Sequence, residues 1–299
     1  MKIIKDLIAV ISSVIIFLVM KIFGNNFTFS KDCTIIIFSK DRVPQLDLLL
    51  RSILENTLGH RQIIIMYRAS TVQAYNSYNK LTKKYLEHEI IFRDEASNDF
   101  RSSLQELVKM SDSKTLCLLV DDDVFYRPFD FSMFDGLSAL EYQPSLRLGF
   151  NITRSWILGI DKMLTPGDII AHNEQQEIYE WQYRKAAGDW GYSFSLDGNF
   201  YHREIFRIIL SLSRFHNPNS LEASLQKFRY FNPWLKGVAL KFSVLFNNPS
   251  NKVQNENNNA SFNNDIELLD ELYARHGSIK MANFSSERVN SVHTYFEFE

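Results

Sequence analysis

From residue 33 onward, short apolar runs alternate with stretches of helical periodicity. Four of the runs are almost continuously apolar over about five residues, which is typical of strands covered on both faces. They predict strands at residues 34–38, 63–67, 89–93 and 115–120.

The segments between these runs have the spacing of amphipathic helices. The first begins at Pro44, a residue type favoured at the first helical position. A second helix is predicted over residues 71–86, and Ser97 or Asn98 is expected to cap a third. Three strand–helix units that lead into a fourth strand predict an α/β fold, with a largely parallel sheet covered by helices on both faces.

After residue 124 the pattern changes to short strand-like stretches and aromatic-rich loops. Strands are expected at residues 147–152 and 192–196, and helices at 220–228 and 265–276. Asn264 and Glu267 have capping-box spacing at the start of the last helix, and Gly277 is placed to end it. The asparagine-rich segment 247–264 is expected to be a long loop. We therefore expect one globular domain over residues 31–299, with a nucleotide-type half (31–127) and a mixed half (128–299).

The first 30 residues are expected to form a membrane anchor and a short linker. Residues 7–20 carry no charge and are mostly Ile, Val and Leu, with Lys2 and Lys5 before them and Lys21 after them. This core is somewhat short for a bilayer, but flanking lysines can extend towards the headgroups. A cleaved signal peptide and an interfacial helix are the alternatives. Lysines at both ends leave the orientation undetermined by the positive-inside rule.

Composition narrows the class of protein. Apolar residues make up 45% of the chain, which is enough for a large core and argues against disorder. The formal net charge is −2, so no basic field is present and nucleic acid is excluded as an expected partner. The two cysteines, Cys33 and Cys117, give neither a disulfide framework nor a zinc motif.

The strongest chemical signal is the run Asp121, Asp122 and Asp123, directly after the apolar run 115–120. Ligands of open α/β sheets bind beyond the carboxyl ends of the strands. Three adjacent carboxylates at such a place repel one another unless a cation neutralises them. Oxygen ligands favour Mn2+ or Mg2+, and such an ion bridges diphosphates. The alternative is a solvated acidic turn.

These features resemble the nucleotide-sugar half of GT-A glycosyltransferases, of the family 2 and exostosin-like types. The likeness covers residues 33–127: a strand, the turn 39–44, an amphipathic helix and later Leu-Leu-Val-Asp-Asp-Asp at 118–123. Asp121 and Asp123 match the DxD motif of that fold. Weaker likeness to a bacterial group of such transferases extends to the stretches at 188–190, 196–198, 217–222 and 251–254.

The resemblance implies a Rossmann-like GT-A fold with a mixed central sheet, and a hexosyltransferase with a nucleotide-diphosphate sugar donor, UDP-sugars favoured. It implies that Arg42 faces the base or ribose, that Asp94 meets the uracil or ribose edge, and that Arg101 approaches the diphosphate. Asp121 and Asp122 are counted with them as donor-binding residues. The implied acceptor is a hydroxyl of a glycan or a lipid-linked molecule. Surface solvation is the alternative for the two arginines.

Glu222 is the candidate general base, because transfer with inversion needs a group that accepts the acceptor's proton. It lies in the first turn of the helix expected after a Pro-Asn loop, the place of the base in inverting GT-A enzymes; the alternative is a carboxylate that only interacts with the helix dipole. Asp197, beside Gly198, is expected to hold the donor sugar, unless it merely forms a turn.

Five further candidates rest on weaker signals. His293 is expected to complete the metal shell with Asp121 and Asp123, as a C-terminal histidine does in many GT-A enzymes, and Lys252 to neutralise the diphosphate from a closing loop. Trp181, Trp190 and Tyr192 are candidates for stacking on sugars, although aromatic residues are more often core.

Three alternatives remain for the aspartate cluster. A phosphatase of the haloacid-dehalogenase type needs Thr or Val where Phe125 stands, and a nucleotidyltransferase needs glycines that the turn 39–44 lacks. A non-catalytic sugar-binding protein on the same fold is the third. The anchor and the resemblance favour the bacterial inner membrane with a cytoplasmic domain; a Golgi type II protein is the alternative, since four Asn-x-Ser/Thr sequons suit a lumen.

Overall fold

The computed structural model describes residues 27–95, 99–155, 159, 169–230, 232, 234–249 and 266–299. The expected anchor at residues 7–20 lies outside them, as do Lys252, Ser97, Asn98 and most of the expected loop at 247–264. None of the helices within these ranges is both long and apolar enough to cross a bilayer.

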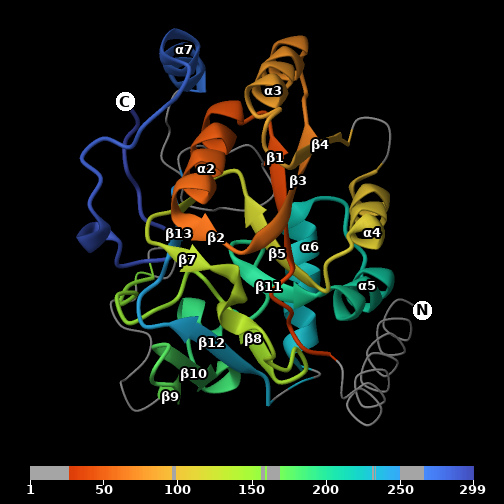
Figure 1. Ribbon diagram of the computed structural model, residues 1–299, viewed down its shortest axis with the longest axis vertical. Coiled ribbons are helices and arrows are strands. Elements are labelled where there is room, and N and C mark those ends of the chain that lie inside the picture. The colour runs from red at the N-terminus through yellow and green to blue at the C-terminus, as the bar shows by residue number, and fades with distance from the viewer. Residues whose placement is uncertain are drawn as a thin grey trace.

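The central sheet has five strands in the order β11-β5-β1-β3-β4 (Figure 1). Four of them are parallel: β1 (Cys33–Lys40), β3 (His60–Arg68), β4 (Ile90–Asp94) and β5 (Thr115–Val120). The fifth, β11 (Asn199–His202), pairs antiparallel with β5. The four predicted strands and the mixed α/β architecture are confirmed.

Alternate residues of the strands bury themselves in two cores, one on each face of the sheet. Ile35 and Ile37 of β1 pack with α2 (Val43–Asn56) and α3 (Val72–Lys84). Ile36 and Phe38 pack on the other face with α4 (Phe100–Met110) and α5 (Arg203–Leu212). Period-two alternation of this kind follows from the pleat of a strand.

The helix ends depart slightly from the sequence expectation. Asp99 caps α4, because its side chain accepts a hydrogen bond from Ser102 N at 3.0 Å. Pro218 opens α6 (Pro218–Leu225), and a short 3-10 turn (Gln226–Tyr230) follows it. The last helix, α7 (Ile266–His276), ends before Gly277, whose φ of +71° suits a C′ glycine as predicted.

A second sheet, absent from the sequence prediction, lies below the first in Figure 1. Its order is β8-β12-β10-β9, with bounds Tyr142–Pro144, Lys236–Leu240, Ile178–Gln182 and Ile170–Asn173. The strands expected at 147–152 and 192–196 are wrong: both segments are irregular. Single backbone bonds, such as Phe150 N to Lys241 O at 2.8 Å, hold the segment 147–152 in place without a strand ladder.

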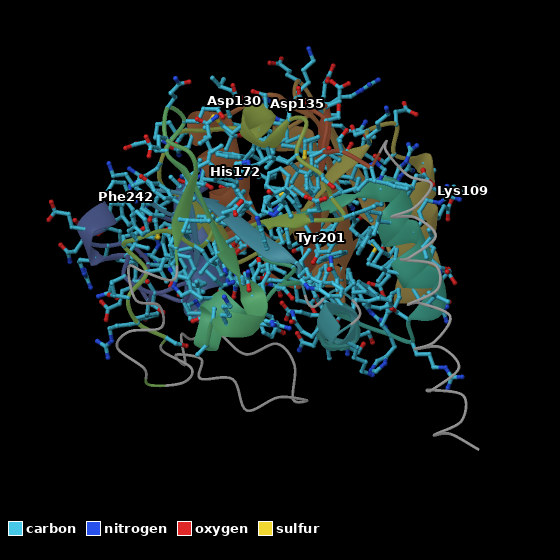
Figure 2. The ribbon with its side chains drawn as sticks, turned by 90° about the horizontal axis from the view of Figure 1, so that it is seen from below. Lys109, Asp130, Asp135, His172, Tyr201 and Phe242 are labelled. Carbon is cyan, nitrogen blue, oxygen red and sulfur yellow. The ribbon has the colours of Figure 1, made fainter. Side chains whose placement is uncertain are left out.

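Two small strand pairs complete the sheets. β6 (Asp123–Phe125) pairs antiparallel with β13 (Leu245–Asn247), and β2 (Thr57–Leu58) pairs parallel with β7 (Phe129–Asp130). Short 3-10 helices occupy the loops at Phe131–Phe134, Tyr183–Lys185, Gly188–Gly191 and Ser286–Arg288. Figure 2 shows Tyr201 of β11 among the packed side chains of the interior, and Lys109 of α4 at the rim.

Candidate active site

The three aspartates lie where the carboxyl ends of β5 and β1 meet. Asp121 follows β5 directly, and its backbone N–H donates to Phe38 O of β1 at 3.1 Å. Asp123 begins β6, so the chain turns within the cluster. This is the edge at which open α/β sheets bind ligands, as the sequence predicts.

Arg42, at the turn after β1, is the counter-ion of this cluster. Its Nη1 lies 3.2 Å from Asp121 Oδ1 and 3.1 Å from Asp122 Oδ2. Lys40 N donates to the other Asp121 oxygen at 3.1 Å. Burial raises the pKa of Asp121 to about 6 against the attraction of Arg42, so Asp121 is still ionised at neutral pH. The assignment of Arg42 to the base or ribose of the donor stays a prediction; in the structure its guanidinium is directed at the carboxylates of Asp121 and Asp122.

Asp123 differs from its neighbours because no cationic side chain among the described residues forms an ion pair with it. It is fully buried, and its Oδ2 accepts a hydrogen bond from Val120 N at 3.0 Å. Burial, followed by the charge of Asp197, raises the pKa of this carboxyl well above its usual value. Asp123 is therefore the carboxylate whose ionised form a bound cation would stabilise most.

Asn247 links the aspartates to the C-terminal segment. β13 places it opposite Asp123, and its Nδ2 donates to Asp122 Oδ1 at 2.6 Å. Its backbone also bridges to His293, whose Nδ1 lies 3.3 Å from Asn247 Oδ1. Burial lowers the pKa of His293, which favours the neutral imidazole that binds metals. The sequence analysis missed Asn247, although it follows an apolar run just as Asp121 does.

A second group of charges reaches the same edge from the later part of the chain. β11 runs antiparallel to β5, and Gly198 N donates to Leu118 O at 2.8 Å, which places Asp197 beside the end of β5. Arg147 Nη1 lies 2.8 Å from Asp197 Oδ2. Arg147 was not predicted; a single arginine between buried Leu146 and Leu148 is the signal that would have found it.

Glu222 belongs to this second group. Asn217 and Ser220 form a capping box at the start of α6, and Glu222 Oε1 accepts a hydrogen bond from Leu196 N at 3.2 Å. Burial and the charge of Asp197 raise the pKa of Glu222 to about 7, against the attraction of Arg147. A carboxylate that titrates near neutrality can accept a proton from a hydroxyl and later release it.

The donor types of the first group suit a divalent ion, but their arrangement does not close around one. Carboxylate oxygens and a neutral imidazole are ligands of Mn2+, and Asp123 offers a buried carboxyl that forms no ion pair with a cationic side chain of the described residues. Among the described residues, no three His, Cys, Asp or Glu side chains are arranged as a ready metal site. Protein donors hold these carboxylates instead, namely Arg42, Lys40 N, Val120 N and Asn247.

The donor-binding roles of Arg101 and Asp94 stay predictions. Arg101 Nη2 donates to Ser211 O at 3.2 Å, and its guanidinium lies 5.8 Å from the centre of the Phe215 ring, so it is directed at the segment around the end of α5 rather than at the aspartates. Asp94 ends β4, the outermost strand, and is exposed.

Trp181 and Trp190 are core residues, as the sequence analysis favoured over stacking on sugars. They are only 2% and 3% exposed, their rings pack 4.8 Å apart, and Trp181 Nε1 donates to Trp190 O at 2.9 Å. Buried indoles commonly satisfy their N–H in this way. Tyr192 is half-buried beside Glu222, whose charge adds to burial in raising the pKa of the Tyr192 hydroxyl.

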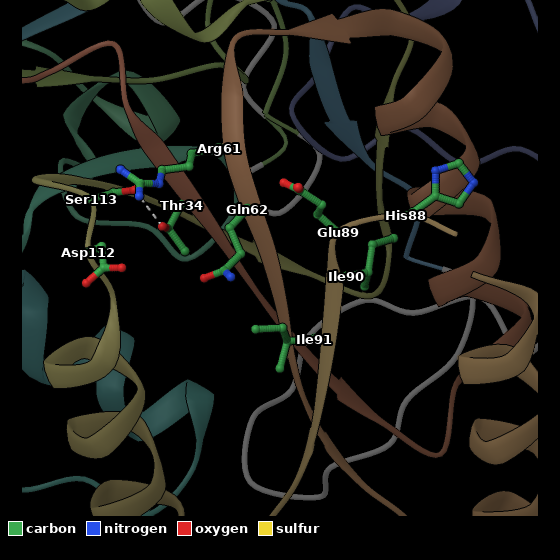
Figure 3. A pocket seen from close by; sticks show the side chains of 9 residues that line it. All are labelled: Thr34, Arg61, Gln62, His88, Glu89, Ile90, Ile91, Asp112 and Ser113. Atoms are coloured by element: carbon green, nitrogen blue, oxygen red, sulfur yellow. Dashed lines mark hydrogen bonds between the residues drawn. The ribbon is translucent and has the colours of Figure 1, made fainter. Parts of the chain in front are cut away.

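One cavity of about 480 Å3 lies at the opposite edge of the central sheet (Figure 3). It is formed near the amino ends of β1, β3 and β4, and its lining includes Gln62, Glu89 and Asp112. None of the residues of the two charged groups lines it. The candidate site is therefore defined by its side chains and not by this cavity.

No family model and no curated protein matches the chain. Among solved structures, it is similar to GalNAc-T7 with UDP, GalNAc and Mn2+ (11% identity, 75% of this chain and 44% of that chain, TM-score 0.46). It is also similar to a mannosyltransferase from Pyrobaculum calidifontis in complex with GDP-Man and Mn2+ (11%, 48% and 45%, 0.32). A third similar structure is a nucleotidyl transferase from Methanothermobacter (10%, 70% and 86%, 0.39).

The chain spans less than half the length of the first two proteins. Because the identities and TM-scores are so low, these similarities concern the fold alone and carry no conclusion about the activity of this chain.

Proposed function

We propose that this chain is a GT-A-type glycosyltransferase, which moves a sugar from a nucleotide-diphosphate donor to a hydroxyl of a glycan or lipid-linked acceptor. The observation that carries the proposal is the meeting of two groups distant in sequence: Asp121 to Asp123 after β5, and Asp197 with Glu222 from β11 and α6. The first group suits a cation and a diphosphate, and the second offers a proton acceptor at neutral pH.

In this proposal Asp123 is the principal ligand of Mn2+ or Mg2+, with Asp122 and His293 as partners. These residues would hold the ion, which would supply positive charge to the diphosphate leaving group. Asp121, whose oxygens are held by Arg42 and Lys40 N, orients the turn rather than leading the coordination. Arg42 keeps two of the three carboxylates from repelling each other before the donor binds.

Glu222 is the proposed general base, and the direction of its pKa supports this role. With a pKa of about 7 it is partly ionised at neutral pH, so it can take the proton of the attacking hydroxyl. Asp197, held by Arg147, is proposed to position the donor sugar beside it. A base on one face of the sugar and a leaving diphosphate on the other correspond to inversion at the anomeric carbon.

Thermal unfolding with added ligands tests the proposal without knowledge of the acceptor. Mn2+ together with UDP or GDP should raise the melting temperature more than either alone, because a ligand that binds only the folded state stabilises it. Asp123→Asn should abolish the joint effect, whereas Asp32→Asn, a change at an exposed aspartate ahead of β1, should retain it. An equal joint effect in the Asp123 variant would contradict the proposed metal site.

Turnover separates a transferase from a protein that only binds sugars. Slow release of nucleotide diphosphate from a nucleotide sugar in the presence of Mn2+ is expected of a transferase without its acceptor. Binding of nucleotide sugars with no release, with or without a panel of glycan acceptors, would instead indicate a non-catalytic sugar-binding protein.

A further inference from the structure

Arg147 is buried where an arginine is costly. Its side chain is 4% exposed, and its neighbours in sequence, Leu146 and Leu148, are 1% and 2% exposed. A guanidinium cannot release its proton, so its burial is tolerated only beside compensating charge. Asp197, with a contact of 2.8 Å, supplies part of that compensation.

Four carboxylates act on the charge of Arg147, and three of them belong to the candidate site. Asp197, Asp189, Glu222 and Asp123 each stabilise the positive charge of Arg147, which raises its pKa although burial opposes this. Within the described residues, Arg147 is the one cation that forms an ion pair with any of Asp123, Asp197 and Glu222. Its contact with Asp197 uses Nη1, whereas its Nε is buried without a hydrogen-bond partner.

An arginine that serves only the stability of the fold would be expected to make more hydrogen bonds than this one. A structural arginine that holds a carboxylate commonly uses two nitrogens in a fork, and an unpartnered buried N–H is unfavourable. The arginine is placed for its charge among carboxylates rather than for the number of its hydrogen bonds.

We propose that Arg147 is a positioning residue: it fixes the Asp197 carboxylate and supplies the positive charge that lets Glu222 ionise beside Asp197. The inference rests on the proposed function for its consequence in catalysis, but not for the electrostatic effect itself. Without this charge, the two partly buried carboxylates of Asp197 and Glu222 would repel each other and hold a proton between them.

The groups that face Glu222 make the effect predictable. Asp197 opposes its ionisation, whereas Arg147, the Leu196 N–H and the Ser195 hydroxyl favour it. Tyr192 and Tyr201 also lie within its electrostatic reach, and burial raises the pKa of both hydroxyls, so they stay neutral at neutral pH. Only Asp197 and Arg147 of these groups carry charge there, and they act in opposite directions.

The primary test is an NMR titration of Glu222 in protein carrying carboxyl-labelled glutamate, which needs no substrate. Arg147→Gln keeps a donor near Asp197 but removes the charge, and should move the midpoint of Glu222 upward by about one pH unit or more. Arg147→Lys should restore most of the shift. Asp197→Asn should move the midpoint downward, and Arg184→Gln, at an exposed arginine, should leave it unchanged.

The pH dependence of turnover with a nucleotide sugar is the second readout. The acidic limb of kcat should move upward with the NMR midpoint in Arg147→Gln, while KM for the donor changes less than about threefold. If Arg147→Gln does not fold, the same measurements on Arg147→Lys and Asp197→Asn decide. An unmoved Glu222 midpoint in the folded Arg147 variant, or an upward shift in Asp197→Asn, would overturn the inference. If the Glu222 midpoints shift as expected but the protein shows no turnover, the proposed transferase activity is refuted and the role of Arg147 still holds.

Discussion

Glu222→Gln should make the protein more stable at alkaline pH and leave its stability unchanged at acidic pH. The folded state raises the pKa of Glu222 from 4.5 to about 7, chiefly because the carboxylate is buried. The folded state therefore binds a proton more tightly than the unfolded state, and stability is lost as the pH rises between these two values. Glutamine removes the ionisation and can still accept the hydrogen bond from Leu196 N.

The expected magnitude follows from the size of the shift. At about 1.4 kcal/mol per pKa unit, the ionised Glu222 lowers the free energy of unfolding by about 3 kcal/mol above pH 7. The difference between variant and wild type should be near zero below pH 4.5 and should grow to about that value by pH 8. Such a gain is typical when a charged group of an active site is replaced by a neutral one.

Urea unfolding at a series of pH values from 4 to 9 measures this difference directly. Glu106→Gln is a suitable control, because Glu106 lies exposed on α4 and should show a difference near zero throughout. A difference for Glu222→Gln that stays flat across this range, or a variant that is less stable at pH 8, would refute the reasoning about its burial.

Two further changes test the packing that supports the site. Asp47, fully buried in α2, forms ion pairs with Lys84 at 2.7 Å and Arg51 at 3.2 Å. Asp47→Ala should therefore lower the free energy of unfolding by about 3 kcal/mol, because it leaves the two cations without their partner. A loss below about 1 kcal/mol in urea unfolding would contradict this. Gly198 has a φ of +76°, and an added Cβ would lie 2.4 Å from Leu245 Cδ2. Gly198→Ala should therefore lower the free energy of unfolding by about 2 kcal/mol or more in the same assay. An unchanged free energy would contradict this and show that the turn before β11 can shift.

The strands of the central sheet could be predicted because their signal is local. Ile35, Ile36 and Ile37 are all fully buried, so the run of β1 needs no alternation to be recognised. The position of Asp121 after β5 was predictable for the same reason, since a strand and its carboxyl end are read from one segment.

The second sheet could not be predicted because its polar residues hide the pattern. Glu180 in β10 is 6% exposed, yet it is satisfied by Lys236 at 2.6 Å and His172 at 2.9 Å, which come from β12 and β9. From sequence alone a glutamate predicts an exposed loop, because its buried partners are not visible. Here one partner, Lys236, is 56 residues away from Glu180 in the sequence. Polar satisfaction across long separations is therefore the information that a local pattern lacks.

The counter-ions of the site were missed for a related reason. Three adjacent aspartates led to the expectation of a metal as their counter-charge, but Arg42 and Arg147 supply positive charge from other segments. The resemblance assigns Arg42 to the base or ribose of the donor, and this role stays a prediction; its ion pairs with Asp121 and Asp122 were not foreseen. Asp197 and Glu222 were chosen from short motifs, and their shared position depends on β11 and α6 coming together with β5.

The central claim is that the carboxylates after β5 serve the transfer of a sugar from a nucleotide. Its most direct test is the release of nucleotide diphosphate from a panel of UDP- and GDP-sugars, with Mn2+ or with EDTA, by the wild type, Asp123→Asn and Asp32→Asn. We expect release by the wild type and the Asp32 variant with Mn2+, and at least about a 100-fold loss with EDTA or in Asp123→Asn. Release at the same rate by the Asp123 variant would contradict the account.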